Sequence, residues 1–303
     1  MTALQVGVIG LGSMGLGMAQ SIARRGLAVR GYDLNAAAVA KLAGTGGLSG
    51  TSAHDAAKDA DILLVVVVNA AQTDRVLFGV EGAAAAMKPS GVIVSCATMA
   101  PSDARSLAAK ASSAGLLYLD APMSGGAAKA AMGQLTVMAS GSKEAFSKAR
   151  TVLNAIAATV HELGEAPGIG ASFKMVNQLL AGVHIAAACE AITFAQKLGL
   201  DITTVYKVIT GSAGNSWMFE NRVPHVLDGD YSPRSAVDIF TKDLGIVSDM
   251  GRAEKFPLQL SATALQMFLM TAAAGMGSDD DASVARMIAE ITGLELPQMR
   301  TAT

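Results

Sequence analysis

The stretch LQVGVIGLGSMGLGMA at residues 4–19 decides the fold, because it joins a strand pattern directly to a helix pattern. Residues 4–10 are a short β-branched run, and residues 14–26 have apolar residues at helical spacing. Between them lies Gly10-Leu11-Gly12-Ser13-Met14-Gly15, which has the GxGxxG spacing. Such glycines permit a tight turn and let a pyrophosphate approach the helix N-terminus. The stretch predicts a dinucleotide-binding turn; the alternative is a glycine turn that binds nothing.

An acidic residue stands where this kind of turn requires one. Asp33 ends the strand-like run at residues 28–33, about twenty positions after the glycines. A carboxylate there accepts hydrogen bonds from the ribose hydroxyls of NAD and repels the 2′-phosphate of NADP. Leu34 and Asn35 follow, so no arginine directly follows Asp33 to bind that phosphate. We expect NAD as the cofactor, bound by residues 10–15 and Asp33.

The first half of the chain alternates strand-like and helix-like segments. Continuous apolar runs occur at residues 62–68, 91–97 and 116–122, as in strands buried on both faces of a parallel sheet. Helical connections fit between these runs, which is typical of βαβ units. Residues 1–164 are therefore predicted to form an α/β domain with a Rossmann-type doubly wound sheet.

The second half fits helices. Residues 172–199 predict one long interdomain helix that ends at Gly199. The charged run at 277–283 is expected to be a solvated helix start. The glycine and proline content of residues 164–170 places the boundary there, so residues 165–303 are predicted to form an all-helical C-terminal domain. Further helices are expected at 203–211, 216–227, 239–253 and 258–275.

Composition excludes several classes of protein. The 303 residues carry a net charge of −2 and offer no basic patch for nucleic acid. Cys96 and Cys189 are too few for a disulfide framework, and neither they nor the four histidines show metal-ligand spacing. The longest apolar runs are too short to span a bilayer, and the N-terminal residues lack a basic signal-peptide pattern. We expect a cytoplasmic protein without a metal and without nucleic-acid or membrane partners.

A second glycine-rich motif, DAPMSGG at residues 120–126, follows the buried strand that ends at Asp120. Backbone N–H groups in a turn such as Ser124-Gly125-Gly126 form a cradle that suits a carboxylate. Doubly wound folds bind their ligands at the carboxyl ends of the strands. The motif predicts a site for a substrate carboxylate; the alternative is an ordinary loop.

A lone lysine marks a third motif, GIGASFKMVNQ at residues 168–178. Lys174, Asn177 and Gln178 have the i, i+3, i+4 spacing of one helix face. A lysine that is partly desolvated beside a cofactor can transfer a proton, and the amides can hold it and a substrate hydroxyl. Gly168 and Gly170 are expected to let the chain approach a ligand. The alternative is a lysine that reaches solvent from an interdomain helix.

The motifs occur in the order of a known family. Over essentially its whole length the chain resembles the β-hydroxyacid dehydrogenases, the family of 3-hydroxyisobutyrate dehydrogenase and tartronate semialdehyde reductase. The resemblance implies an NAD-dependent dehydrogenase that acts on the CH–OH group of a small hydroxy acid. The matching stretches are GLGSMGLGMA (cofactor loop), DAPMSGG with GQLTVMASG (substrate loop), GIGASFKMVNQ (catalytic helix) and AVDIFTKDLGIVSD at 236–249 (KDL segment).

The resemblance also implies roles for single residues. Lys174 matches the catalytic acid/base of the family. Thr98 matches a hydroxyl residue near the nicotinamide ribose, and Lys242 matches a lysine that closes over the cofactor from the helical domain, which would complete the substrate site. The matching substrate-binding positions are Ser124, Gly125, Gly126, Asn177 and Gln178.

Four further stretches, at 67–72, 178–191, 213–245 and 256–268, resemble family members that oxidise the C2 hydroxyl of a four-carbon sugar acid. Two sister activities stay open, on tartronate semialdehyde and on 3-hydroxyisobutyrate, and so does a catalytically silent cofactor-binding module. The alanine-rich interdomain helix suggests a homo-oligomer, a dimer or a tetramer. His184 and Trp217 are weaker candidates for the pocket.

Overall fold

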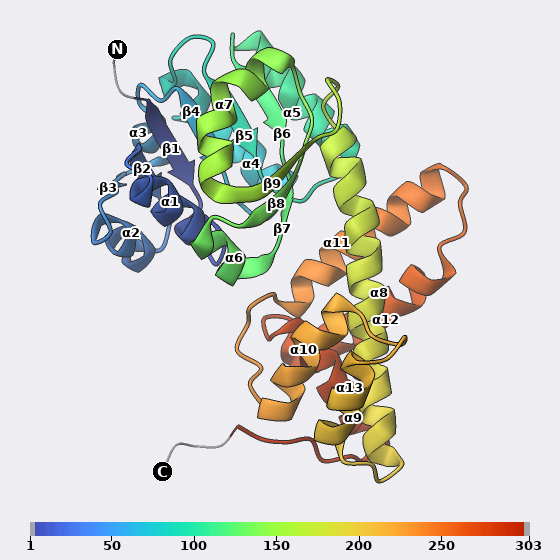
Figure 1. Ribbon diagram of the computed structural model, residues 1–303. Coiled ribbons are helices and arrows are strands. Elements are labelled where there is room, and N and C mark those ends of the chain that lie inside the picture. The colour runs from blue at the N-terminus through green and yellow to red at the C-terminus, as the bar shows by residue number, and fades with distance from the viewer. Residues whose placement is uncertain (1–3, 300–303) are drawn as a thin grey trace. The chain divides into compact units, whose positions relative to one another are not determined.

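The computed structural model of the protein describes residues 4–299 (Figure 1). It comprises two compact units, which divide between Lys174 and Met175 inside a long helix. The first unit is an α/β domain, and the described part of the second is helical. The domain boundary that we expect after residue 164 lies earlier in the chain than this division, and it stays a prediction.

The first unit is built on a six-stranded parallel sheet with the strand order β3-β2-β1-β4-β5-β6. All of these strands except the short edge strand β3 lie where the sequence predicts them, and the Rossmann-type sheet is confirmed. The strand order reverses between β1 and β4, and doubly wound sheets bind their ligands at such a point. The strands are β1 (Gln5–Ile9), β2 (Ala28–Tyr32), β3 (Leu48–Ser49), β4 (Ile62–Val65), β5 (Val92–Ser95) and β6 (Leu117–Asp120).

The central strands are apolar throughout because helices cover both faces of the sheet (Figure 1). Along β4, Ile62 and Leu64 belong to one hydrophobic core, which includes side chains of α1 and α7. Leu63 and Val65 belong to a second core, which includes side chains of α4 and α5. The helices of this unit are α1 (Gly15–Arg24), α2 (Ala36–Ala43), α3 (Ala53–Ala57), α4 (Ala70–Phe78), α5 (Pro101–Ser113), α6 (Gly126–Met132) and α7 (Lys143–Ile156).

A second, three-stranded sheet belongs to the same unit and is not predicted from the sequence. Its strands are β7 (Met123–Ser124), β8 (Leu135–Ala139) and β9 (Ala157–Glu162). β7 runs antiparallel to β8, and β9 runs parallel to it. An isolated bridge joins Asp120, at the end of β6, to Ser140, just after β8. The DAPMSGG motif therefore lies where the two sheets meet.

The helices of the C-terminal part agree with the prediction, and α13 follows the helix start that is expected at residues 277–283. Helix caps explain several boundaries: the Asp201 side chain accepts from Thr204 N at the start of α9, and Gly229 ends α10 in the left-handed region with φ 64°. The helices are α8 (Ile169–Lys197), α9 (Ile202–Thr210), α10 (Trp217–Asp228), α11 (Val237–Ala253), α12 (Gln259–Thr271) and α13 (Val284–Thr292).

Helix α8 corrects the expectation that every apolar stretch is too short to span a bilayer. With 29 residues it has the length and apolar composition of a membrane-crossing helix, and it is the one such helix within residues 4–299. However, 56% of its apolar window is buried inside the protein. Ile185, Cys189 and Ile192 of α8 belong to the hydrophobic core of the helical unit. The apolar character of α8 is therefore explained by its place at the centre of that unit.

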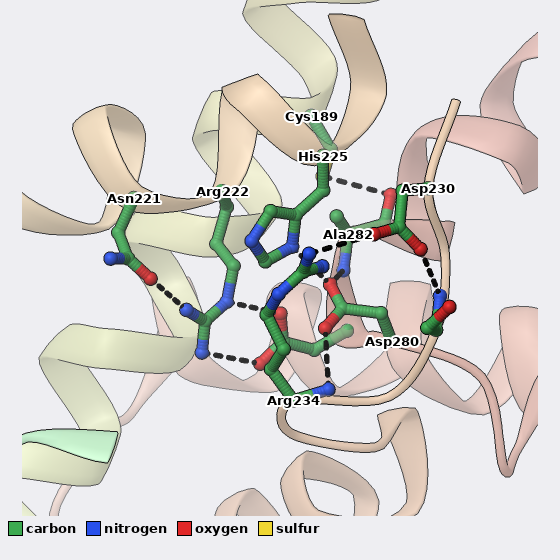
Figure 2. A network of polar contacts seen from close by, with 10 residues as sticks. Cys189, Asn221, Arg222, His225, Asp230, Arg234, Asp280 and Ala282 are labelled. Atoms are coloured by element: carbon green, nitrogen blue, oxygen red, sulfur yellow. Dashed lines mark hydrogen bonds and ion pairs between the residues drawn. The ribbon is translucent and has the colours of Figure 1, made fainter. Parts of the chain in front are cut away.

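The charged run at residues 277–283 starts a helix, as expected, because Asp280 caps the short 3-10 helix Asp281–Ser283 through Ala282 N, directly before α13. The run is not solvated, however, so that part of the expectation is wrong. Asp280 and Asp281 are fully buried and paired with basic residues of α10 (Figure 2). Arg222 donates from Nε to Asp281 Oδ1 at 2.5 Å, and His225 Nδ1 lies 2.7 Å from Asp280 Oδ1. Asp280 Oδ2 also accepts from the backbone N–H of Arg234, 3.0 Å away. The partners lie more than fifty residues earlier in the chain, where local sequence patterns do not reveal them.

Candidate active site

The glycine loop follows β1 at the point where the strand order reverses. Gly10 has φ +91°, and a Cβ there would overlap the carbonyl oxygen of Val66, which follows β4. A Cβ on Gly15 would overlap the carbonyl oxygen of Gly10. Both positions therefore require glycine for the turn itself. In contrast, a Cβ on Gly12 would meet no atom within 4 Å, so the space in front of Gly12 is open.

Helix α1 begins directly after this loop and leaves its first amide groups without a side-chain cap. Met14 occupies the N-cap position and makes no side-chain cap hydrogen bond, and the first turn contains no acidic residue. A helix N-terminus of this kind attracts an anion through its N–H groups and its dipole. The open space at Gly12 and this uncapped end fit the pyrophosphate of a dinucleotide.

Asp33 lies at the end of β2, where it contacts the glycine loop. Its Oδ2 accepts from Leu11 N at 2.6 Å, and its Oδ1 accepts from Asn35 N at 2.7 Å. A carboxylate has about four lone-pair sites, so both oxygens of this half-buried side chain keep acceptor capacity for ribose hydroxyls. Asp33 therefore has a second task that the sequence does not predict, which is to hold the loop at Leu11. Asn35 in turn caps α2 through Ala37 N.

Lys174 and the Ser-Gly-Gly turn, which are far apart in the sequence, come together in the first unit. Lys174 is buried, and its Nζ donates to the carbonyl oxygen of Met123 at 2.9 Å. Met123 directly precedes Ser124, which ends β7. Gly125 and Gly126 have φ values of +138° and +75°, which glycine adopts readily. Gly126 is exposed, so a partly accessible turn lies one residue from the atom that Lys174 contacts.

The two glycines before Lys174 have a different purpose from the one expected. Gly168 has φ +93°, and a Cβ on Gly170 would lie 2.5 Å from Met138 O and 2.7 Å from Asp120 O. Gly170 therefore lets the start of α8 approach the backbone of the two sheets, whereas a Cβ on Gly168 would lie 2.8 Å from Pro101 O of α5. Packing accounts for both glycines without a ligand.

In the second unit, Gln178 and Lys242 share one partner, Asp243. Gln178 Nε2 donates to Asp243 Oδ2 at 2.5 Å, and Lys242 Nζ donates to Asp243 Oδ1 at 2.5 Å. Asp243 is 1% exposed, so its carboxylate is buried between an amide and an ammonium group. Asn177 Nδ2 donates to Gln178 Oε1 at 3.0 Å. The charged pair in the apolar stretch IFTKDLG predicts that Asp243 pairs with a neighbouring base, and its pairing with Lys242 confirms this. The contact with Gln178 is not predicted from the sequence.

The remaining candidates are less informative. Thr98 is half-buried in the segment between β5 and α5, at the carboxyl end of the sheet. Trp217 is 51% exposed at the start of α10, and His184 is half-buried on α8. Within residues 4–299, His, Cys, Asp and Glu side chains form no group of three or more that would hold a metal ion.

Two family models match the chain in succession. Residues 5–164 match the NAD-binding domain of 6-phosphogluconate dehydrogenase, and residues 168–288 match the NAD-binding model of NADP-dependent 3-hydroxyisobutyrate dehydrogenase. Both descriptions name a nicotinamide dinucleotide, which is the class of cofactor that the glycine loop and α1 fit.

Similar proteins extend over nearly the whole chain. An L-threonate dehydrogenase of Cupriavidus necator is 53% identical and covers 96% of this chain and 97% of its own. An L-threonate dehydrogenase of Escherichia coli K12 is 51% identical and covers 95% of each chain. A crystal structure of a 3-hydroxyisobutyrate dehydrogenase from Salmonella typhimurium has 50% identity and a TM-score of 0.90, and covers 94% of this chain and 99% of its own.

These likenesses agree with the geometry of the loop, the sheet and the helical unit. They also show an oxidoreductase, and the interpretation as a catalytically silent module is set aside. The chain belongs to the 3-hydroxyisobutyrate dehydrogenase family of nicotinamide-dependent dehydrogenases, which oxidise small hydroxy acids.

Proposed function

We propose that this enzyme oxidises L-threonate at C2 to 2-oxo-tetronate with NAD. Relatives named L-threonate dehydrogenase, at 53% and 51% identity over nearly full length, support this substrate. The chemistry is a loss of a hydride from C2 and of a proton from the C2 hydroxyl. Bound NAD supplies the acceptor for the hydride, and the protein must supply the acceptor for the proton.

One observation carries the proposal: Lys174 is buried and donates at 2.9 Å to Met123 O, directly before the Ser124-Gly125-Gly126 turn. We assign Lys174 the task of accepting the hydroxyl proton. The turn is assigned the substrate carboxylate, because consecutive N–H groups form a site for anions. Ser124, Gly125 and Gly126 then orient C2, since the carboxylate is attached to it. Proximity of this kind supplies a large part of the rate enhancement in enzymes.

The roles of the second cluster are part of the same proposal. Asn177 and Gln178 are assigned to the substrate hydroxyls and Lys242 to the cofactor, so that the helical domain, residues 165–303, completes the substrate site. Asp243 supports this assignment, because its carboxylate fixes the Gln178 amide and the Lys242 ammonium at 2.5 Å each. Thr98 is assigned to the nicotinamide ribose, and residues 10–15 with Asp33 to the rest of the dinucleotide.

A second substrate has support of its own. The solved structure at 50% identity is named a 3-hydroxyisobutyrate dehydrogenase, so oxidation of 3-hydroxyisobutyrate is the first alternative. Reduction of tartronate semialdehyde is another, because the motifs of this chain also resemble those of tartronate semialdehyde reductases. The three substrates share a carboxylate for the turn, but L-threonate presents several hydroxyl groups to the amides, whereas 3-hydroxyisobutyrate and tartronate semialdehyde each present a single one.

The test is a screen of NAD reduction, followed at the absorbance of NADH. The acids are L-threonate, D-threonate, erythronate, glycerate and 3-hydroxyisobutyrate, each measured for kcat/KM. We expect L-threonate to exceed the others by at least about tenfold, because a site built to bond its hydroxyls disfavours acids that lack one of them. D-threonate and erythronate have all of the hydroxyls but point at least one in another direction, so they also leave a polar group of the site unpaired. Stronger turnover of glycerate or 3-hydroxyisobutyrate would overturn the substrate proposed here.

We also propose that the protein is a cytoplasmic homo-oligomer. Helix α8 exposes Val176, Leu180 and Phe194, and contiguous apolar surface commonly marks an interface. Cys96 and Cys189 are free thiols, which suits a reducing compartment. Light scattering after gel filtration distinguishes a dimer or tetramer from a monomer, and cell fractionation tests the compartment.

A further inference from the structure

Asp120 is a buried carboxylate that the proposed mechanism does not use. It ends β6, is 1% exposed, and its side chain contacts two backbone amides and one hydroxyl through the same oxygen, Oδ2. Oδ2 accepts from Gly168 N at 3.0 Å and from Ala171 N at 2.8 Å, and it lies 3.4 Å from the Ser140 hydroxyl. The amide of Ala171 lies in the first turn of α8, and that of Gly168 directly precedes the helix. Asp120 belongs to β6, far from α8 in the sequence, and it caps the start of α8 as an N-cap side chain would.

A second bond fixes the same turn. The Ser140 hydroxyl accepts from Gly170 N at 3.0 Å, and Ser140 is paired with Asp120 through a backbone bridge between the two sheets. Three amides at the start of α8 thus bond to one Asp–Ser pair: that of Gly168, which directly precedes the helix, and those of Gly170 and Ala171 in its first turn. Gly168 and Gly170 allow this approach, because a side chain at either place would be strained or would clash.

The anchored turn leads directly to Lys174. Ala171 and Lys174 have i, i+3 spacing, so they lie one helical turn apart, about 4.5 Å along the helix axis. Lys174 Nζ is held at the other end by Met123 O. Any shift or fraying of the first turn of α8 would carry the Lys174 side chain with it. The position of Nζ relative to the Ser-Gly-Gly turn therefore depends on the anchor.

We propose that Asp120 is a positioning residue for catalysis, which holds Lys174 in register with the substrate turn by anchoring the start of α8; this rests on the proposed function of Lys174. Burial raises the pKa of Asp120, while the amides of Ala171 and Gly168 and the Ser140 hydroxyl lower it. Its charge contributes to the raised pKa of the buried Cys96 thiol, about 12, where burial is the larger cause. Burying a carboxylate costs free energy, and its presence here indicates that the start of α8 requires a strong hydrogen-bond acceptor.

The first experiment compares Asp120→Ala with Asp120→Asn in the full-length enzyme, by kcat, KM and the Kd of NAD. The asparagine keeps an oxygen that can accept both amides, so it should retain kcat within about tenfold. The alanine loses the anchor, and a displacement on the order of 1 Å costs about 100-fold in rate. The Kd of NAD should stay within about threefold in both. Asp201→Ala is the matched control, because it removes a capping aspartate from α9 and should lower Tm without changing kcat.

The second experiment separates positioning from a general structural role. Hydrogen exchange should accelerate at the amides of Gly168 and Ala171 in Asp120→Ala, at least tenfold, and remain near native in Asp120→Asn. The double variant Asp120→Ala with Lys174→Ala should be no slower than Lys174→Ala alone, because Asp120 acts through the lysine. Normal kcat in Asp120→Ala, or rate losses that multiply in the double variant, would overturn the inference.

Two further outcomes are informative. If the alanine at 120 prevents folding, Ser140→Ala removes the bond to Gly170 N and the contact with Asp120 Oδ2 but keeps the carboxylate bonds to Gly168 N and Ala171 N. This variant should lower kcat several-fold with faster exchange; unchanged kcat with faster exchange would refute the inference. Normal turnover of Lys174→Ala would refute the proposed function and with it the catalytic purpose of Asp120. In that case the exchange rates still decide whether Asp120 holds the helix.

Discussion

The choice between NAD and NADP can be changed at two adjacent residues, Asp33 and Leu34. Asp33 Oδ2 lies 2.6 Å from Leu11 N, which fixes the carboxylate beside the cofactor loop. The 2′-phosphate of NADP would face this negative charge. Leu34 is 93% exposed, so an arginine there has room to reach the phosphate. We predict that Asp33→Asn with Leu34→Arg moves the preference from NAD toward NADP.

The size of the effect follows from the partial exposure of Asp33. Two unit charges at about 4 Å repel by ~1 kcal/mol in water and by ~4 kcal/mol at an effective dielectric constant of about 20. Asp33 is half-buried, so the repulsion lies between these limits. At about 1.4 kcal/mol for each factor of ten, the native enzyme should prefer NAD by about 5-fold to about 700-fold in kcat/KM. Asparagine removes the repulsion and keeps one oxygen for Leu11 N, so the loop should stay folded.

The assay is kcat/KM for each cofactor at saturating substrate, for the native enzyme, both single variants and the double variant. Asp33→Asn should remove the discrimination, and Leu34→Arg should add preference for NADP. Asp61→Asn is a control at the amino-terminal ends of β1 and β4, away from the glycine loop, where Asp61 bonds Gln5 N and Lys88, and it should leave the ratio unchanged. Equal or better use of NADP by the native enzyme would refute the assignment of Asp33 to the ribose.

Three further predictions concern stability and the loop. Asp281→Ala should lower the free energy of unfolding, measured by urea denaturation, by about 3–5 kcal/mol, because it leaves the buried Arg222 without its ion pair. As a control, Asp279→Ala removes a more exposed ion pair and should change the free energy of unfolding by about 1 kcal/mol or less. Gly15→Ala should lower Tm and abolish NAD binding, because the methyl group would overlap a backbone oxygen, whereas Gly12→Ala should keep Tm and weaken only NAD binding in calorimetry. The pKa of Asp55 is lowered, chiefly because its carboxylate accepts a hydrogen bond from the backbone amide of Thr51. The charged carboxylate therefore stabilises the fold above the ordinary pKa of an aspartate, and this stabilisation is lost as the pH falls through the lowered pKa. The difference in unfolding free energy between the native protein and Asp55→Asn should shrink in that range of pH.

The Rossmann sheet could be predicted because its strands are buried on both faces. Segments such as ILLVVVV contain no polar residue, and a continuous apolar run bounded by loops has few other interpretations. The glycine loop could also be predicted from the sequence, because the backbone turn itself requires glycine at positions 10 and 15. Lys174 stood out because it is the one charged residue in its stretch, and the structure places it against the residue before Ser124.

The parts that were not predicted depend on contacts between distant segments. β7 has only two residues, too few for a periodic pattern, and it exists because it pairs with β8. Asp280 and Asp281 read as a solvated run, because nothing local shows the arginine and histidine that bury them. Asp120 likewise gives no local sign of its task, since the amides that it accepts from lie about fifty residues later.

The central claim is that Lys174 is the acid/base of hydroxy-acid oxidation, and single-turnover kinetics of Lys174→Ala test it most directly. Enzyme saturated with NAD is mixed with L-threonate, and the formation of NADH is followed across a range of pH. Because only a neutral lysine can accept the hydroxyl proton, we expect the native rate of oxidation to rise toward alkaline pH. For Lys174→Ala we predict a loss of about 10²–10⁴-fold in the rate of the chemical step, with the Kd of NAD unchanged and this alkaline rise abolished. Native-like formation of NADH in this variant, with the same rise toward alkaline pH, would contradict the account.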